Sequence, residues 1–187
     1  KSLFGLGEIY AKSKLHIIHR LDRPATGVVL FAKTESALVS LNDQFKNKEV
    51  RKTYLAVVKN KPLQPEGKLV HYLKKHARQN RSVASDTEIP GSKKSELNYR
   101  LISSIENYHL LEIELITGRH HQIRAQLSAI GCPVKGDDKY GFKRANSDHS
   151  IHLHAWKLRF RHPVSGEIEE IMAPVPAEDP VWKAFKI

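Results

Sequence analysis

A single aspartate surrounded by basic residues is the strongest candidate for chemistry in this sequence. Asp22 stands between Arg20 and Arg23 in the segment 19–27, which reads HRLDRPATG. The positive charges on both sides favour the ionised carboxylate. An ionised aspartate suits a nucleophile or a general base. The alternative is that Asp22 only forms an ion pair with a neighbouring arginine.

Polar residues also gather where a helix is expected to begin. The segment 117–124, TGRHHQIR, leads into apolar residues at helical spacing, Ile123 and Leu127, and Gly131 should end the helix. A helix N-terminus favours anions. The candidates for substrate binding at this point are Arg119, His121 and Gln122. Arg124 by itself fits a surface position on the helix equally well.

The histidines do not form a metal-binding pattern, although the chain has eleven of them. Neither His120 with His121 nor His152 with His154 has a cysteine or carboxylate at ligand spacing, and no HExxH or CxxC motif occurs. The glycine-rich phosphate loops and the GxSxG elbow are missing as well. We therefore expect no metal, and no nucleotide or redox cofactor.

The charge balance points to a polyanionic partner. Lys and Arg number 31 against 20 Asp and Glu, which leaves a formal charge of +11. Such a surplus is typical of nucleic-acid binding. No apolar run approaches the ~18 residues that a membrane span needs, so we expect no membrane. Cys132 is the only cysteine, which favours a reducing compartment, and we expect the cytoplasm.

The elements that must position these residues are mixed. Thr34 is a plausible N-cap for a helix over 35–47, and the tail from Asp179 suggests a last helix. The segment 51–59, with Tyr54, has apolar residues on both faces, as in a strand buried on both sides. Residues 1–14 are expected to form a short helix or loop. Further strands are expected at 15–18, 27–33, 68–75, 95–104, 108–116, 151–160 and 167–172.

These elements predict an α+β fold, with one domain built on a mixed, largely antiparallel sheet and flanking helices. The basic segment 74–94 allows two interpretations. It is either a mobile arm or a solvated surface hairpin, and a charge run alone favours the hairpin. Arg78 and Arg81 within it are candidates for contacts with a nucleic acid.

Four motifs together resemble the RluA family of RNA pseudouridine synthases. The resemblance extends from residue 15 to about residue 174, with the motifs in the family's order. They read HRLDRPATG (19–27, followed by AKT), RKTYLAVV (51–58), ITGRHHQIRAQLSAIGCPVKGDDKYG (116–141) and LHAWKLRFRHPVSGE (153–167).

The resemblance implies a role for each motif. Asp22 corresponds to the catalytic aspartate that acts on the target uridine. Tyr54 is expected to stack on the uracil and to help the C5 proton leave, and Arg124 to pair with Asp22. In the same loop, Arg20 would fill the space left by the flipped base, with His19 beside it. The residues expected to line the uracil pocket are Ile123 and Leu127.

The sequence departs from the family pattern in two ways. Ala25-Thr26 replaces the usual Thr-Ser, and the earlier strand with a Lys-Pro motif and an S4-type domain are not found. We therefore expect residues 1–187 to be one catalytic domain without the family's first strand, and to act as a monomer. The expected substrate is structured RNA, ribosomal rather than transfer RNA. The rival hypothesis is a catalytically silent RNA-binding domain.

Overall fold

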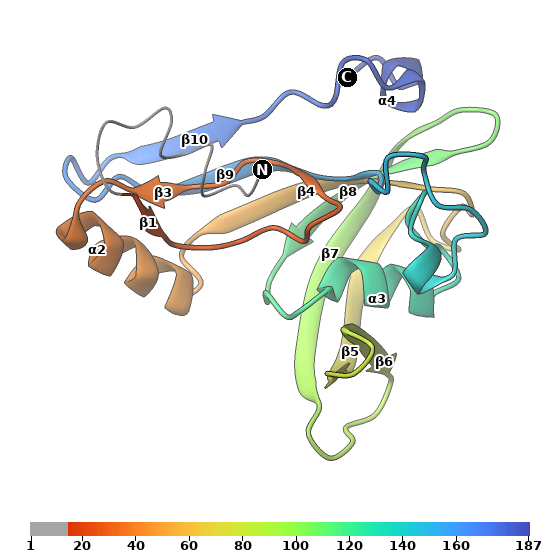
Figure 1. Ribbon diagram of the computed structural model, residues 1–187, viewed down its shortest axis with the longest axis horizontal. Coiled ribbons are helices and arrows are strands. Elements are labelled where there is room, and N and C mark those ends of the chain that lie inside the picture. Colours follow the sequence, from red (N-terminus) through yellow and green to blue (C-terminus); the bar gives the residue numbers. More distant parts are fainter. Residues whose placement is uncertain (1–14) are drawn as a thin grey trace.

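An eight-stranded sheet dominates the computed structural model, which describes residues 15–187 (Figure 1). Its strands are β2 (Thr26–Gly27), β4 (Arg51–Val58), β5 (Glu66–His76), β6 (Arg81–Ser85), β7 (Lys93–Ser104), β8 (His109–Leu115), β9 (Leu153–Arg161) and β10 (Ile168–Met172). They run in the order β10-β9-β4-β8-β7-β5-β6, and β2 pairs with β9. A separate two-stranded sheet joins β1 (His16–Ile17) to β3 (Phe31–Ala32). The expectation for residues 1–14 lies outside the described part.

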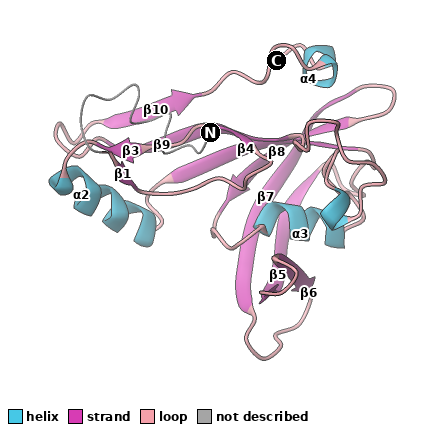
Figure 2. Cartoon of the chain, in the orientation of Figure 1, coloured by secondary structure: helices cyan, strands magenta, loops and turns pink. Residues whose placement is uncertain are grey.

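Helices flank both faces of the large sheet. They are α2 (Glu35–Lys46), α3 (Gln122–Ala129), the short 3-10 helix η1 (Asp138–Tyr140) and α4 (Pro180–Ala184). Figure 2 shows α2 and α3 on one side of the sheet and α4 on the other. Every pairing in the large sheet is antiparallel except that of β2 with β9. The predicted α+β class with a mixed, largely antiparallel sheet is confirmed.

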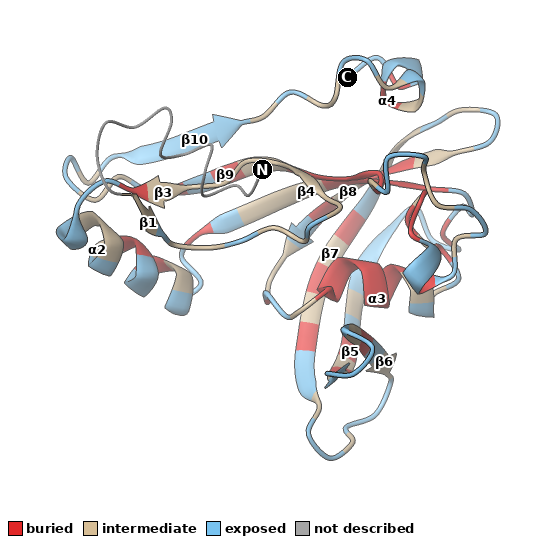
Figure 3. Ribbon diagram, in the orientation of Figure 1, coloured by how far each residue is buried: buried red, intermediate tan, exposed pale blue. Residues whose placement is uncertain are grey.

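Strand β4 is buried on both faces, as its sequence predicts. Tyr54, Ala56 and Val58 pack in the core beneath α3, whereas Leu55 and Val57 pack against the residues around α4. Figure 3 shows the buried colour running through the middle of the sheet and along α3. Alternation at period two thus gives this strand two separate apolar cores.

Local signals also define the helix ends. The side chain of Thr34 accepts a hydrogen bond from the amide of Ala37, so α2 begins where its N-cap predicts. Asp179 caps α4 in the same way, through the amides of Val181 and Trp182. The hairpin predicted over 95–104 and 108–116 is confirmed by β7 and β8.

The two strands predicted around the Asp22 loop are wrong in extent. Each is reduced to two-residue pieces, and Ile17 is 44% exposed. The physical reason is an anchor on β9. Gly27 has φ +118°, and a Cβ there would lie 2.2 Å from the carbonyl oxygen of Ala155. Only glycine allows this approach, so Thr26 and Gly27 pair with β9, whereas Phe31 and Ala32 pair with β1, and the segment does not run as one strand.

The basic segment 74–94 is part of the sheet, so the arm interpretation is wrong: residues 74–85 form the β5–β6 hairpin, and a loop leads from it to the start of β7 at Lys93. Strand β5 pairs with β6 from Tyr72 to His76, with the turn at 77–80. The hairpin has a buried side, since Leu73 and Ser82 are almost inaccessible. Its basic side chains are carried on a fixed part of the sheet.

Candidate active site

A cleft of about 480 Å³ opens between the Asp22 loop, β4 and the start of α3. Segments far apart in the sequence meet there, from His19 to Leu153. Asp22 and Tyr54 line the cleft, and Arg124 reaches Asp22 from α3 behind it. The structure therefore brings together the aspartate, tyrosine and arginine that the sequence singled out.

The Asp22 loop is held at several points by hydrogen bonds. The amide of Ala25 donates to the carbonyl of Asp22 at 2.9 Å, closing a turn, and the carbonyl of Pro24 accepts from Ile151 at 2.9 Å. The Thr26 hydroxyl lies 2.7 Å from Nδ1 of His154. A loop fixed in this way can hold a carboxylate in one position.

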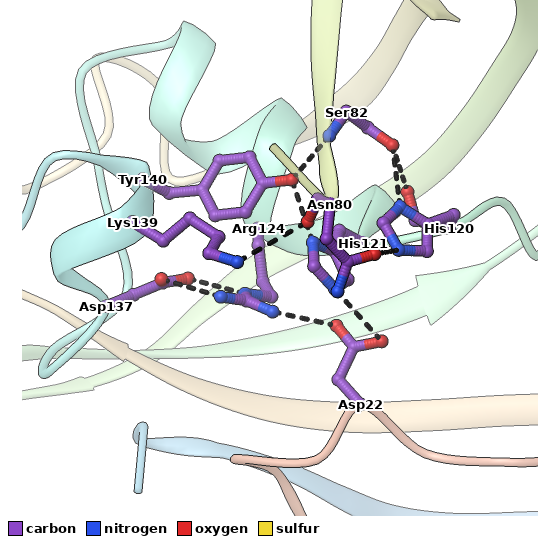
Figure 4. A network of polar contacts seen from close by, with 9 residues as sticks. All are labelled: Asp22, Asn80, Ser82, His120, His121, Arg124, Asp137, Lys139 and Tyr140. Atoms are coloured by element: carbon purple, nitrogen blue, oxygen red, sulfur yellow. Dashed lines mark hydrogen bonds and ion pairs between the residues drawn. The ribbon is translucent and has the colours of Figure 1, made fainter. Parts of the chain in front are cut away.

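Arg124 is divided between two aspartates, as Figure 4 shows. Its Nε and Nη2 donate to the two carboxylate oxygens of Asp137 at 2.7 and 2.8 Å, and both side chains are buried. The remaining Nη1 lies 3.4 Å from Oδ2 of Asp22, whose side chain is 22% exposed. Burial by itself would lower the pKa of Arg124, but the hydrogen bonds and charge of Asp137 outweigh it and raise that pKa.

Asp22 has two ion-pair contacts in the described part of the chain, and neither involves the adjacent arginines. One is Arg124, and the other is His121, whose Nε2 lies 4.0 Å from Oδ1 of Asp22. The simple pairing of Asp22 with Arg20 or Arg23 is thus not what the structure contains. The carboxylate faces the start of α3 instead.

Tyr54 presents its ring to the cleft from β4. Burial, and then the negative charge of Asp22, raises the pKa of Tyr54 to about 12. The side chain is therefore a neutral phenol at physiological pH. A flat ring beside an ionised carboxylate suits stacking against a planar base more than proton abstraction by a phenolate.

Other expected site residues also lie at the cleft, with different environments. Arg20 and Arg119 are exposed at its edge, and Ile123 lines it from α3. His19 accepts a hydrogen bond from the amide of Leu30 at its Nε2 and stacks on a phenylalanine ring. Burial, followed by the charge of Lys52, lowers the pKa of His19 to about 4. His19 is thus a neutral residue that shapes the loop.

The structure places Leu127 away from the cleft, contrary to expectation, and it defines the surroundings of Gln122 and Arg78. Leu127 is 0% exposed and packs in the core, because the turn of α3 directs it into the sheet and away from the cleft. Gln122 touches the cleft, but its amide is engaged with Thr117, Arg119 and Glu96. Arg78 lies exposed in the β5–β6 turn, outside the residues that line the cleft.

Arg81 reaches the site indirectly. Its guanidinium lies 5.1 Å from the ring centre of Tyr140, and Arg124 lies 4.8 Å from the same ring. The Tyr140 hydroxyl accepts a hydrogen bond from the amide of Ser82 on β6 at 2.8 Å. These contacts attach the basic hairpin to the polar network around Asp22.

Sequence reasoning missed Asp137 and Tyr140 as parts of this site. Both belong to the GDDKYG end of the third motif, so the signal was present in the quoted residues. Their roles depend on η1 folding back under α3, which no local pattern reveals. Lys52 was also missed, although it lines the cleft two residues before Tyr54.

Two features are absent from residues 15–187, the part of the chain that the structure describes. No group of three or more His, Cys, Asp or Glu residues is placed to hold a metal ion in that range. No helix there is both long and apolar enough to cross a membrane.

Comparison with known proteins points to one family. The model of the RNA pseudouridylate synthase family matches residues 6–129. An uncharacterised RNA pseudouridine synthase of Chloroflexus aurantiacus is 38% identical over 164 residues, which cover 87% of this chain and 50% of that protein. Ribosomal large subunit pseudouridine synthase C of Yersinia pestis is 36% identical over 168 residues, covering 86% of this chain and 52% of its own.

Solved structures agree with the sequence matches. Human RNA Pseudouridylate Synthase Domain Containing 1 has a TM-score of 0.75 at 25% identity, over 87% of this chain and 70% of that one. The chain spans about half the length of the curated relatives it matches. With the family model covering more than half of its residues and the ordered motifs meeting in one cleft, the chain belongs to the RluA family of RNA pseudouridine synthases.

Proposed function

We propose that this protein isomerises uridine to pseudouridine in RNA, and that residues 1–187 form its catalytic domain. The observation that carries the proposal is the convergence of Asp22, Tyr54 and Arg124 at one cleft from a loop, a strand and a helix. Family membership supports the reaction class, and the geometry supports the residues that perform it. No nucleotide or redox cofactor is needed for this isomerisation.

The reaction breaks the bond between N1 of uracil and C1′ of ribose and forms a bond between C5 and C1′. N1 gains a proton and C5 loses one, so the atoms balance without a co-reactant. Asp22 either attacks C1′ or promotes loss of the base through a glycal-like species. In both routes Arg124, with Nη1 3.4 Å from Oδ2 of Asp22, orients the carboxylate toward the cleft.

The target nucleotide must leave its helix to reach Asp22, because C1′ and C5 are inaccessible in stacked RNA. Extrusion costs a few kcal/mol. Arg20 is exposed at the edge of the cleft, where a guanidinium can stack in the vacated space and offset part of that cost. Tyr54 then stacks on the uracil within the cleft.

Structured RNA, and ribosomal RNA in particular, is the proposed substrate. The net charge of +11 and the exposed Arg119 and Lys75 at the cleft favour a phosphate backbone. Several relatives carry the name ribosomal large subunit pseudouridine synthase C. That name describes those proteins, and it supports the ribosomal preference proposed here.

The decisive experiment compares wild type with Asp22→Asn in tritium release from RNA labelled at uridine C5, taken from cells lacking the protein. We expect the variant to bind RNA normally and release no tritium. It should also stay folded, because Arg124 keeps its bidentate partner Asp137. Asp43→Asn, at an exposed position of α2, is the matched control.

Two results would contradict the proposal in different ways. Tritium release by Asp22→Asn would remove Asp22 from the catalytic role. RNA binding by the wild-type protein without any new pseudouridine in mapped ribosomal and transfer RNA would favour the silent RNA-binding domain.

A further inference from the structure

We propose that His121 is a neutral hydrogen-bond donor that orients Asp22, and that Tyr140 fixes which ring nitrogen carries the proton. The inference rests on the proposed catalytic role of Asp22 and extends it to a positioning residue. It is carried by the hydrogen bonds around His121, which lies at the start of α3 and is nearly inaccessible.

The tautomer of His121 follows from its partner. Nδ1 lies 3.0 Å from the Tyr140 hydroxyl, which already accepts the amide hydrogen of Ser82 at 2.8 Å. The phenol has one proton to give, and Nδ1 of His121 is its acceptor within the described residues. Because Nδ1 accepts, the ring hydrogen of a neutral histidine must be on Nε2.

The protonated nitrogen faces the carboxylate. Nε2 of His121 lies 4.0 Å from Oδ1 of Asp22, while Nη1 of Arg124 lies 3.4 Å from Oδ2 (Figure 4). Each carboxylate oxygen therefore faces a different side chain from the start of α3, a hydrogen-bonded one at Oδ2 and His121 just beyond hydrogen-bond distance at Oδ1. Both distances are long in the free protein, and catalytic hydrogen bonds commonly shorten once substrate is bound.

The ring has little freedom to turn away. His120 stacks on it with centroids 3.8 Å apart, and His120 is itself held by the Ser82 hydroxyl at 3.0 Å and by Asn80 at 3.1 Å. The backbone of His121 is left-handed, at φ 51° and ψ 30°, and its side chain does not cap the helix. Such backbone strain clusters at functional sites, and here it turns the ring toward Asp22.

The surroundings keep His121 uncharged. Burial, and then the nearby positive charge of Arg124, lowers the pKa of His121 to about 3. The other charged or titratable groups facing it are His120, Lys139 and Arg20, together with Asp22 itself. Burial likewise raises the pKa of Tyr140, so the phenol keeps the proton that it donates. A neutral donor fixes the carboxylate without adding a second positive charge, which would weaken it as a nucleophile.

The experiment uses two substitutions that separate donation from ionisation. His121→Gln places an amide N–H near the position of Nε2, whereas the shorter His121→Asn cannot reach Asp22. Asn also tolerates the left-handed backbone, so this variant should fold. His149→Asn is the matched control, because His149 is exposed and has φ 59°.

Kinetics on C5-tritiated RNA should rank the variants. We expect His121→Asn to lower kcat about 10- to 100-fold with little change in KM, as for a lost hydrogen bond to a charged group. His121→Gln should recover most of that loss, and its dependence of kcat on pH should match that of wild type. The proposal is overturned if the two variants are equally impaired while folded, or if His121→Gln loses a limb of the pH profile.

A second readout does not depend on activity. Ring ¹⁵N chemical shifts of His121 in the free protein should show a protonated Nε2 and an unprotonated Nδ1. Tyr140→Phe keeps the ring beside Arg124 but removes the hydroxyl, so the preference of the His121 proton for Nε2 over Nδ1 should weaken. A protonated Nδ1 in wild type would overturn the inference even if the RNA reaction were absent, which separates its failure from that of the proposed function.

Discussion

Replacing Asp137 with asparagine should damage stability and catalysis together. The carboxylate is 1% exposed and accepts two hydrogen bonds from Arg124, at 2.7 and 2.8 Å. Asparagine has almost the same shape, but it removes the charge and turns an NH₂ group toward a guanidinium that only donates. Arg124 would stay buried with one acceptor fewer, and its only remaining anionic partner in the described part of the chain would be Asp22, 3.4 Å away.

The size of the effect follows from burial. Removing one partner of a buried ion pair costs about 3–5 kcal/mol. For a chain of this length each kcal/mol shifts Tm by about 2–4 °C, so the melting temperature should fall by about 6–20 °C. A displaced guanidinium no longer orients Asp22, and misplacement by ~1 Å can reduce kcat about 100-fold.

Thermal unfolding and tritium release measured on the same samples test this reasoning. Asp138→Asn is the control, because Asp138 is the exposed neighbour in η1. Asp22→Asn gives the contrasting pattern, in which activity is lost and Tm is nearly kept. A melting point for Asp137→Asn within about 2 °C of wild type would refute the claim that this pair supports the buried arginine.

Three other predictions concern the cleft and the hairpin. Tyr54→Phe should be about 5- to 150-fold more active than Tyr54→Ala, since base stacking is worth about 1–3 kcal/mol; equal activities would exclude stacking as the contribution. His19 has a pKa of about 4 in the folded protein, against an ordinary value near 6.5. As the pH falls, the unfolded chain therefore takes up a proton on His19 before the folded protein does. The free energy of unfolding should fall by about 3 kcal/mol from pH 7 to pH 4 as a result. In urea unfolding at the two pH values, His19→Gln should lack this decrease in the free energy of unfolding. The prediction is contradicted if the variant and wild type show the same pH dependence. Neutralising Arg78, Lys93 and Lys94 should weaken RNA binding, and the dependence of log K on log salt concentration should become shallower by about 1 per phosphate contact. Neutralising Lys183 and Lys186 at the C-terminal end should change neither quantity. An unchanged slope for the first variant would mean that the basic segment is only a solvated surface.

Local patterns were sufficient for most of the fold. The N-cap at Thr34, the alternation along β4 and the hairpin of β7 and β8 each depend on residues close together in the chain. The spacing of apolar residues and helix capping depend on only a few neighbouring residues, so both can be recognised without knowledge of the tertiary structure. The short strands beside Asp22 could not, because the approach of Gly27 to Ala155 is a contact between distant segments.

The candidate site likewise combines features that the sequence predicts with features that only the tertiary structure decides. The sequence by itself singled out Asp22, a lone aspartate among arginines, as the candidate for chemistry, together with the motifs that carry Tyr54 and Arg124. The tertiary structure decided how they are used, since Asp22 and Arg124 are 102 residues apart and Asp137 takes two of the three guanidinium nitrogens. It also turned Leu127 into the core and His121 toward Asp22. Residue type sets what a side chain can do, whereas partner and burial depend on packing between segments that no local pattern encodes.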